Sequence, residues 1–281
     1  LQAGTQPDLA YCYADHVAQY ITTSKVVDMT KYIKATTGKV NIETEAGAEE
    51  KEVTVGFTAE EIADFVPGYY AEGYATNYAN YASYGYNAES MFTLPFVKST
   101  EVLYYNADAL AKLGREVPTT WDEMWALGDL AAAEGISLFT YPTAGYFDAF
   151  LYALMYSVGG AEFFNNATNY AEGIWETPEA QKCFEIIGKL AEYTNPVTPA
   201  QANDQDFTKN QQLVLDNEAI FMPNGTWIVG EMADAPRAEG FKWGMTALPA
   251  VEAGGDGYSY TWFEQAWIPS GAENVDAAKQ F

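Results

Sequence analysis

Short apolar runs alternate with helix-type segments along this chain, and that alternation limits the fold more than any other feature. Runs typical of strands occur at 7–14, 99–106, 136–141, 219–223 and 241–249. Helix-type segments stand between them, and two of them open on a capping residue followed three positions later by Glu. Strand–helix alternation of this kind is typical of α/β proteins with mainly parallel sheets.

The helix signals are specific enough to place individual helices. Helices are predicted to follow Thr58, Thr120 and Thr177 as capping residues, and Asp15 is expected to cap another. An apolar stretch from Phe147 is predicted to form a buried helix, and further helices are predicted at 107–114, 208–218 and 225–234.

Two segments do not fit the alternation. Residues 34–56 are polar and poorly periodic, so a loop or excursion is predicted there. Residues 69–87 carry seven tyrosines, which is typical of a surface that is aromatic yet hydrated.

Length and charge restrict the possible partners. A chain of 281 residues exceeds the usual size of one domain, so two domains or lobes are expected. The sequence has 39 acidic and 14 basic residues, a net charge of −25. Such a field repels phosphate backbones and anionic lipid surfaces, so no nucleic-acid partner is expected.

Cysteine and histidine content argues against metal and cofactor chemistry. The two cysteines, Cys12 and Cys183, lie far apart and form no metal-binding spacing, and His16 is the single histidine. No metal site and no cofactor are therefore predicted. The chain opens without Met and stops within a helix-type segment, so a fragment with both ends missing is expected.

Catalytic motifs are also missing from the sequence. It contains no G-x-S-x-G, phosphate-binding glycine loop, dinucleotide fingerprint or H-E-x-x-H. The abundance of acids leaves a glycosidase pair of carboxylates open, because sequence does not reveal the separation that such a pair requires.

Three ordered segments together resemble one family. They are "PDLAYCYADHVAQYITTSKVVDM" at 7–29, "LPFVKSTEVLYYNADALAKLGREVPTTWDEMWAL" at 94–127, and "LVLDNEAIFMPNGTWIVGEM" with "GFKWGMTALP" at 213–249. They are similar to segments of the extracellular solute-binding proteins of carbohydrate ABC importers, the maltose-binding-like proteins of solute-binding family 1.

The resemblance implies a fold and a division into lobes. It implies an α/β, two-lobe, periplasmic-binding-protein-like fold of type II, with ligand in the cleft between the lobes. Lobe one would comprise 1–105 plus 259–281, with its C-terminal part missing, and lobe two would comprise 106–258.

Candidate ligand contacts lie where strands pass into helices and where the chain crosses back between lobes. In α/β sheets, ligands bind beyond the carboxyl ends of strands. Sugars need flat aromatic rings and planar polar groups for their hydroxyls. The candidates are Asp15, His16, Ser99, Thr100, Tyr146, Phe147, Asp148, Asn224, Trp227, Trp262 and Glu264.

Plainer interpretations stand beside several of these candidates. Asp15 would simply cap its helix, Ser99 and Thr100 would be ordinary strand residues, and Tyr146 and Phe147 would be core. By resemblance, Asp15 and His16 occupy the positions of an Asp-Arg pair that contacts sugar hydroxyls, with His in place of Arg.

Asn224-Gly225-Thr226 matches the N-x-[ST] acceptor rule for glycosylation, and Asn-Gly is also a turn signal. A bulky glycan is out of place on a loop that forms a site. The turn interpretation is therefore favoured: Asn224-Gly225 is predicted to form the turn between the strand and the helix and so to expose Trp227.

The function predicted from the sequence is capture of a sugar or short oligosaccharide and its delivery to ABC importer permease subunits, without catalysis. A glycoside-acting enzyme, a lectin-like surface module and a binding protein for a glycerol-phosphate-type ligand are the alternatives. We expect an extracytoplasmic monomer, a cell-surface lipoprotein or periplasmic protein, that meets the membrane only through an N-terminal lipid anchor outside this chain.

Overall fold

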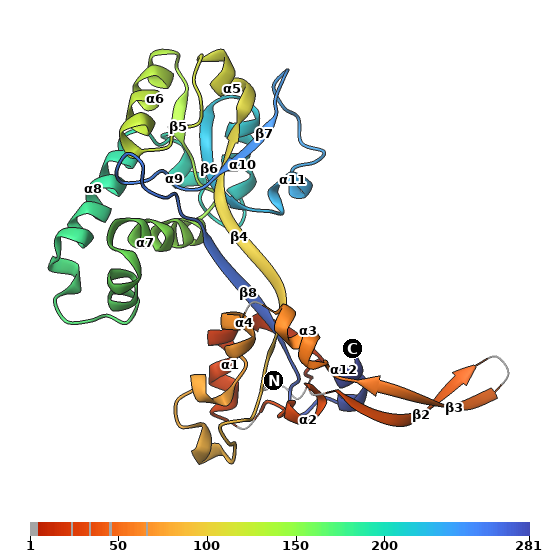
Figure 1. Ribbon diagram of the computed structural model, residues 1–281. Helices are drawn as coiled ribbons and strands as arrows, with labels where there is room; N and C mark the ends of the chain where they lie inside the picture. The colour runs from red at the N-terminus through yellow and green to blue at the C-terminus, as the bar shows by residue number, and fades with distance from the viewer. Residues whose placement is uncertain (1–4, 24, 34, 45–46, 66) are drawn as a thin grey trace. The chain divides into compact units, whose positions relative to one another are not determined.

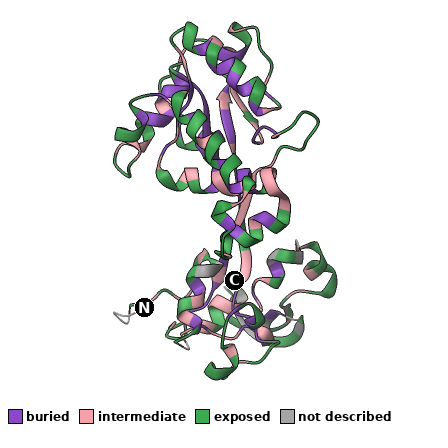
Figure 2. Ribbon diagram, turned by 90° about the vertical axis from the view of Figure 1, so that its left-hand side faces the viewer, coloured by how far each residue is buried: buried purple, intermediate pink, exposed green. Residues whose placement is uncertain are grey.

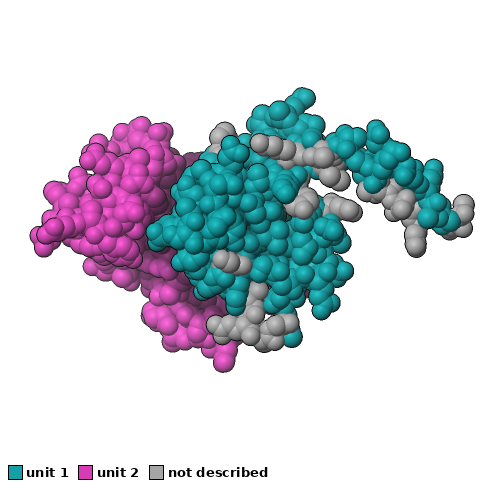
Figure 3. Space-filling model, turned by 90° about the horizontal axis from the view of Figure 1, so that it is seen from below, with its two compact units in different colours: residues 1–98, 262–281 teal, residues 99–261 magenta. Residues whose placement is uncertain are grey.

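The chain divides into two compact units, each described here by itself (Figures 1 and 3). A computed structural model describes residues 5–23, 25–33, 35–44, 47–65 and 67–281. Unit 1 comprises Leu1–Lys98 and Trp262–Phe281, and unit 2 comprises Ser99–Thr261. Both boundaries fall inside strands, whereas the boundaries predicted from the sequence lie at 105/106 and 258/259.

Unit 2 is built around a small sheet with helices on both faces (Figure 1). Strand β4 leads into it from unit 1. Its elements are β4 (Leu94–Asn106), α5 (Ala107–Lys112), α6 (Trp121–Ala133), β5 (Ser137–Phe139), α7 (Ala144–Thr168), η3 (Ile174–Glu176), α8 (Pro178–Glu192), α9 (Thr198–Gln201), α10 (Phe207–Leu215), β6 (Ala219–Gly225), α11 (Ile228–Glu231) and β7 (Trp243–Thr246).

The sheet of unit 2 is mixed. Strands β5 and β6 are parallel, but β4 runs antiparallel to both β6 and β7. The prediction of mainly parallel sheets is therefore wrong for the pairings that the structure describes. The physical reason is that β4 enters from unit 1 in the direction opposite to β6, so its first residues lie beside the carboxyl end of β6.

The two faces of this sheet carry different cores, because successive side chains of a strand point to opposite faces. Leu103 and Phe221 are buried in the cluster that includes α6, α7 and α8. Tyr104 and Met222 are buried in a second cluster with α10 and α11. Figure 2 shows the buried residues inside unit 2. This alternation fixes which face each candidate residue on β4 and β6 can reach.

The predicted helix starts of unit 2 are confirmed at two caps. The Thr120 hydroxyl accepts a hydrogen bond from the backbone N–H of Glu123, and the Thr177 hydroxyl accepts one from Ala180. The buried helix predicted from Phe147 begins at Ala144. Among the described residues, no helix combines the length and apolarity that a membrane crossing requires.

Unit 1 pairs strand β1 antiparallel with the C-terminal strand β8. Its buried apolar residues fall into two small clusters, one around Phe92 and Trp267 and the other around Met91 and Ile268. Its elements are β1 (Ala10–Tyr13), α1 (Ala14–Ile21), α2 (Thr30–Ile33), β2 (Thr36–Thr44), β3 (Gly47–Val55), α3 (Ala59–Asp64), α4 (Pro67–Ala71), η1 (Ala75–Asn77), η2 (Tyr81–Tyr84), β8 (Tyr260–Trp267) and α12 (Val275–Gln280).

The polar segment at 34–56 is not a loop but an antiparallel hairpin. Strands β2 and β3 pair from Thr36 opposite Val55 to Thr44 opposite Gly47, and Lys39 forms a 2.6 Å ion pair with Glu50. In Figure 1 the hairpin extends away from the other elements of unit 1. The exposed side chains described on the hairpin are mostly polar, so the sequence lacks the alternation that a half-buried strand shows.

Other predictions in unit 1 have mixed outcomes. Thr58 and Glu61 form the predicted capping box at the start of α3. Of the tyrosine-rich segment, Tyr70 and Tyr78 are buried rather than at the surface. Helix α1 starts at Ala14 with Tyr13 at the N-cap position, so the prediction that Asp15 caps it is wrong.

Candidate ligand-binding residues

Two aromatic side chains meet where α7 and α11 begin in unit 2. Tyr146 lies in the first turn of α7, and Trp227 occupies the N-cap position of α11. The Trp227 indole Nε1–H donates a hydrogen bond of 3.2 Å to the Tyr146 hydroxyl, with the ring centroids 6.3 Å apart. Trp227 remains 37% exposed. The pair therefore offers a fixed, accessible ring surface with a polar edge.

Gly225, the last residue of β6, makes room for the Trp227 ring. A Cβ atom on Gly225 would overlap that ring, so only glycine allows the indole to lie against the strand. Both Asn224 and Gly225 belong to β6, and the turn is formed by Thr226 and Trp227. The predicted turn at Asn224-Gly225 is therefore displaced by two residues, although it does present Trp227 as expected.

Glu101 lies on the same sheet face as the Trp227 ring. It stands directly opposite Gly225 in the β4–β6 pair, and directly opposite residues point to the same face. The position where the Gly225 side chain would be is filled by the Trp227 ring. The Glu101 side chain must therefore project toward the layer that holds Trp227 and α7.

The Glu101 carboxyl group is buried without a counter-charge. Its exposure is 6%, and its Oε1 atom has no hydrogen-bond partner among the described residues. Burial, reinforced by the nearby Asp148 charge, raises the pKa of Glu101 to about 9. Glu101 is accordingly a neutral acid at pH 7.

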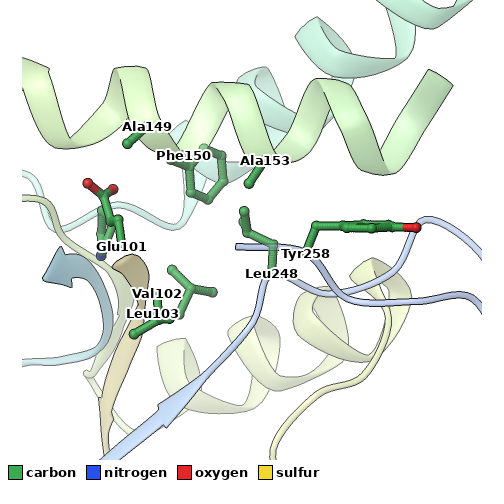
Figure 4. Close-up of a pocket in the computed structure, with 9 residues that line it drawn as sticks. Glu101, Val102, Leu103, Ala149, Phe150, Ala153, Leu248 and Tyr258 are labelled. Atoms are coloured by element: carbon green, nitrogen blue, oxygen red, sulfur yellow. The ribbon is translucent and has the colours of Figure 1, made fainter. Parts of the chain in front are cut away.

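A small pocket lies beside Glu101 (Figure 4). Its inner space is enough for about one water molecule. The other lining side chains come from β4, α7, β6 and the segments before β8. They are Val102, Leu103, Ala149, Phe150, Ala153, Pro223, Leu248 and Tyr258.

Sequence reasoning missed Glu101, although a signal was present. An acid in the apolar run "STEVLYY" is unusual in a strand whose next residues are buried. A charged residue type in a buried strand is rarely accidental, because burying a carboxylate is costly.

Two of the predicted contacts in unit 2 face into the protein. Asn224 pairs with Val102 on the opposite sheet face, is fully buried, and accepts a 2.8 Å hydrogen bond from the Gly225 N–H. Phe147 stacks on Phe150 with centroids 5.2 Å apart and belongs to the edge of the core. Neither side chain shares the exposed surface of Trp227.

The other three candidates of unit 2 differ in which face of the sheet they share with that surface. Asp148 is exposed in the second turn of α7, and its charge acts on the Glu101 carboxyl group. Ser99 is buried and shares the strand face of Glu101 by alternation. Thr100 points to the other face, and its hydroxyl lies 3.2 Å from that of Thr261.

Unit 1 gathers a second set of candidates on β1, α1 and β8. Tyr13 stands opposite Glu264 in the β1–β8 pair, and its ring lies 5.5 Å from that of His16 in an edge-on arrangement. Trp262 precedes Glu264 by two residues and so shares its face. Tyr13, 43% exposed, was not predicted from the sequence. The side chain of Asp15 lies outside the described residues.

This chemistry suits recognition of hydroxyl groups rather than of metal ions. Within the described ranges, no three His, Cys, Asp or Glu residues gather as metal ligands. Exposed rings beside carboxyl groups can stack on a sugar face and bind its hydroxyls.

Solved structures with the same fold define the class of protein. The chain superposes on maltose-bound MalE3 of T. maritima with a TM-score of 0.65 and 19% identity, over 99% of this chain and 62% of that one. It superposes on AcbH, a solute receptor described as exclusively preferring β-D-galactopyranose, with a TM-score of 0.60 and 15% identity, over 99% and 61%. The fold is therefore that of the two-lobe binding proteins.

The family follows from the sequence match. The model of the bacterial extracellular solute-binding protein family matches residues 1–281, and the chain belongs to this family. A diacetylchitobiose-binding protein of Streptomyces coelicolor is 27% identical over 166 residues, 58% of this chain and 34% of the relative. A maltotriose-binding protein of Pyrococcus abyssi is 26% identical over 193 residues, 68% and 39%. The chain thus spans somewhat more than a third of the length of these curated relatives.

Proposed function

We propose that this protein binds a neutral sugar or short oligosaccharide and delivers it to an ABC-type importer without changing it chemically. The observation that carries the proposal is the Trp227 ring, which is exposed, backed by Gly225 and hydrogen-bonded to Tyr146. A ring held in this way can stack on a pyranose without first being ordered, so little side-chain entropy is lost on binding.

The relatives support the ligand class. Their names specify diacetylchitobiose, maltotriose, maltose and β-D-galactopyranose, all of them uncharged sugars. The net charge of −25 acts in the same direction, because it disfavours an anionic ligand such as a glycerol phosphate.

We assign roles in unit 2 by exposure. Trp227 and Tyr146 would stack on the sugar, and Asp148 would accept hydrogen bonds from its hydroxyls. Asn224 would support the end of β6 rather than touch ligand, because its side chain is buried. Ser99 and Thr100 would act as short polar contacts where β4 enters the unit.

Unit 1 supplies a second set of candidate contacts. It comprises Asp15, His16, Trp262 and Glu264, to which the structure adds Tyr13. The partners proposed for the whole protein are the importer permease subunits. We propose an extracytoplasmic location, attachment by a lipid anchor and a monomeric state, which size-exclusion chromatography with light scattering would test.

A sugar panel tests the proposed function. Thermal unfolding and calorimetry would be measured with maltose, maltotriose, diacetylchitobiose, galactose and glycerol 3-phosphate. At least one neutral sugar should raise Tm and release heat, and chromatography should show that sugar unchanged afterwards. Stabilisation by glycerol 3-phosphate alone, hydrolysis of the sugar, or no response to any neutral sugar would contradict the proposal.

A further inference from the structure

We infer that Glu101 is a ligand-recognition residue of unit 2: as a neutral acid it donates a hydrogen bond to a hydroxyl of the bound sugar and favours uncharged sugars. This inference rests on the proposed function and deepens it. It concerns the Trp227 surface and needs no statement about unit 1.

Geometry places Glu101 beside that surface. Glu101 and Gly225 are directly opposite in the β4–β6 pair, and the Trp227 ring covers Gly225 on the face to which Glu101 points. Asp148, from the second turn of α7, acts on the Glu101 carboxyl group. Strand β4 thus places Glu101 on the sheet face that carries α7 and the Trp227 ring.

One oxygen of the Glu101 carboxyl group, Oε1, has no hydrogen-bond partner among the described residues. A protonated carboxyl group has one O–H to donate and also accepts, and a buried polar group without partners is costly. Oε1 has no protein partner, and the adjoining pocket has room for about one water that can donate to it. The O–H on the other oxygen is then left for a sugar hydroxyl.

Charged groups around Glu101 determine its protonation. Asp148 on α7 is the anion that acts on it, and Lys98, on the same strand, is exposed. Strand β6 contributes no titratable side chain, and Glu231 of α11 is hydrogen-bonded to Gln211. The remaining titratable groups on α7 and just before β8 are Glu162 and Asp256, both exposed, and the phenols of Tyr146, Tyr152, Tyr156, Tyr258 and Tyr260.

No cation lines the pocket to hold Glu101 as a carboxylate. The Trp227 surface therefore combines one neutral donor, the Glu101 carboxyl group, with one anionic acceptor, Asp148. A sugar hydroxyl satisfies both, whereas a phosphate or uronate group would be repelled by Asp148 and would find no basic partner.

The pH dependence of binding follows from this protonation state. Burial, reinforced by Asp148, raises the pKa of Glu101 to about 9. The association constant should be level between about pH 6 and 8, where the acid is neutral, and should decline above about pH 9 as the donor is lost.

The test compares wild type with Glu101→Gln and Glu101→Leu by calorimetry from about pH 6 to pH 10, using each neutral sugar of the panel. Gln keeps a neutral donor, so Glu101→Gln should bind at pH 7 within about threefold of wild type and lose the alkaline decline. Leu removes the donor and should weaken binding about tenfold at pH 7. Glu123→Gln, at an exposed helix start, is the matched control and should keep the wild-type profile.

Infrared difference spectra of the wild type provide a second measurement, in which Glu101→Gln serves only to assign the band. Wild type at pH 7 should show a protonated carboxyl band that shifts when the neutral sugar binds and is missing from Glu101→Gln. Identical pH profiles for wild type and Glu101→Gln, or no shift of that band, would overturn the inference alone. If wild type binds no neutral sugar at pH 7, the proposed function itself fails.

Discussion

The two sets of candidate residues differ in how firmly their own unit holds them. In unit 2, Trp227 is fixed by a hydrogen bond to Tyr146 and by contact with Gly225, next to one large core cluster. In unit 1, Tyr13 and His16 contact each other at the end of β1, and the buried residues are divided between two small clusters. A ring that is ordered before binding loses less entropy, so we expect unit 2 to set the affinity and unit 1 to add to it.

The largest expected effect comes from removing a core side chain, and it should differ between the two units. Phe221 in β6 and Phe92 in unit 1 are both fully buried. Phe221→Ala should lower the free energy of unfolding of unit 2 by about 3–5 kcal/mol. It should also abolish sugar-dependent stabilisation, because Trp227 lies in the turn that directly follows β6.

Calorimetry with and without a neutral sugar measures both effects. Phe92→Ala, the matched control, should destabilise unit 1 yet leave part of the sugar response. Equal loss of the sugar response in both variants would remove the distinction between the units.

Removal of the ring itself is the next effect in size. Trp227→Ala should weaken sugar binding by about 2–3 kcal/mol, roughly 30- to 150-fold, since exposed tryptophans of this kind dominate binding. Tyr13→Ala should cost less than about tenfold. Titration calorimetry at pH 7 gives both values.

Trp175→Ala is the control for loss of an exposed indole in unit 2. Trp175 is 44% exposed and packs on Phe184. Its removal should leave affinity unchanged. A greater loss for Tyr13→Ala than for Trp227→Ala would reverse the proposed ranking of the units.

Gly225→Ala tests whether the position of the ring matters as well as its presence. The added Cβ would overlap the Trp227 ring, so the indole must move away from its position over Gly225. We expect affinity to fall about tenfold or more, with the sheet retained. Gly230→Ala, where a Cβ meets nothing within 4 Å, should bind normally. Normal binding by Gly225→Ala would show that sugar binding does not require the Trp227 ring to pack on Gly225.

A smaller change removes only the hydrogen bond. Tyr146→Phe keeps the ring of Tyr146 but removes the acceptor of the Trp227 indole. A hydrogen bond of this kind contributes about 0.5–1.5 kcal/mol, so affinity should fall roughly 2- to 10-fold. Tyr156→Phe on the same helix, with its ring on Tyr258, should have no effect. Equal affinities of Tyr146→Phe and wild type would argue that packing alone positions Trp227.

The smallest expected effect is on pH dependence in unit 1. Burial alone would raise the pKa of Asp28, but hydrogen bonds from Thr30 and Ser90 outweigh it and lower the pKa below its ordinary value of 3.8. The stabilisation is thus complete above 3.8 and is lost as pH falls through the lowered pKa. Asp28→Asn should make the stability of unit 1 fall less steeply at acidic pH. Calorimetry at several pH values measures this dependence. An unchanged dependence at acidic pH would show that Asp28 does not contribute.

Local signals in the sequence were sufficient for three helix starts and for the position of Trp227 after β6. Capping at Thr58, Thr120 and Thr177 depends on neighbours three residues apart, so it can be predicted without knowledge of the fold. The presentation of Trp227 after β6 likewise follows from a strand end followed by a helix start.

The sequence was insufficient to predict features that depend on which strands pair and in which register. The β2–β3 hairpin shows no one-sided apolar pattern, so only pairing of the two strands reveals it. The opposite faces of Asn224 and Glu101 follow from the β4–β6 register, which places Val102 opposite Asn224 and Gly225 opposite Glu101. A shift of one residue in that register would exchange their roles.

The most direct test of the central claim is the indole resonance of Trp227 in a nitrogen–proton NMR spectrum, assigned with Trp227→Phe. Addition of a neutral sugar that calorimetry shows to bind should shift the Trp227 resonance, because the sugar stacks on its ring beside Tyr146. The Trp175 resonance should stay in place. A saturated complex in which the Trp227 resonance does not move would contradict the claim that unit 2 holds sugar on this ring.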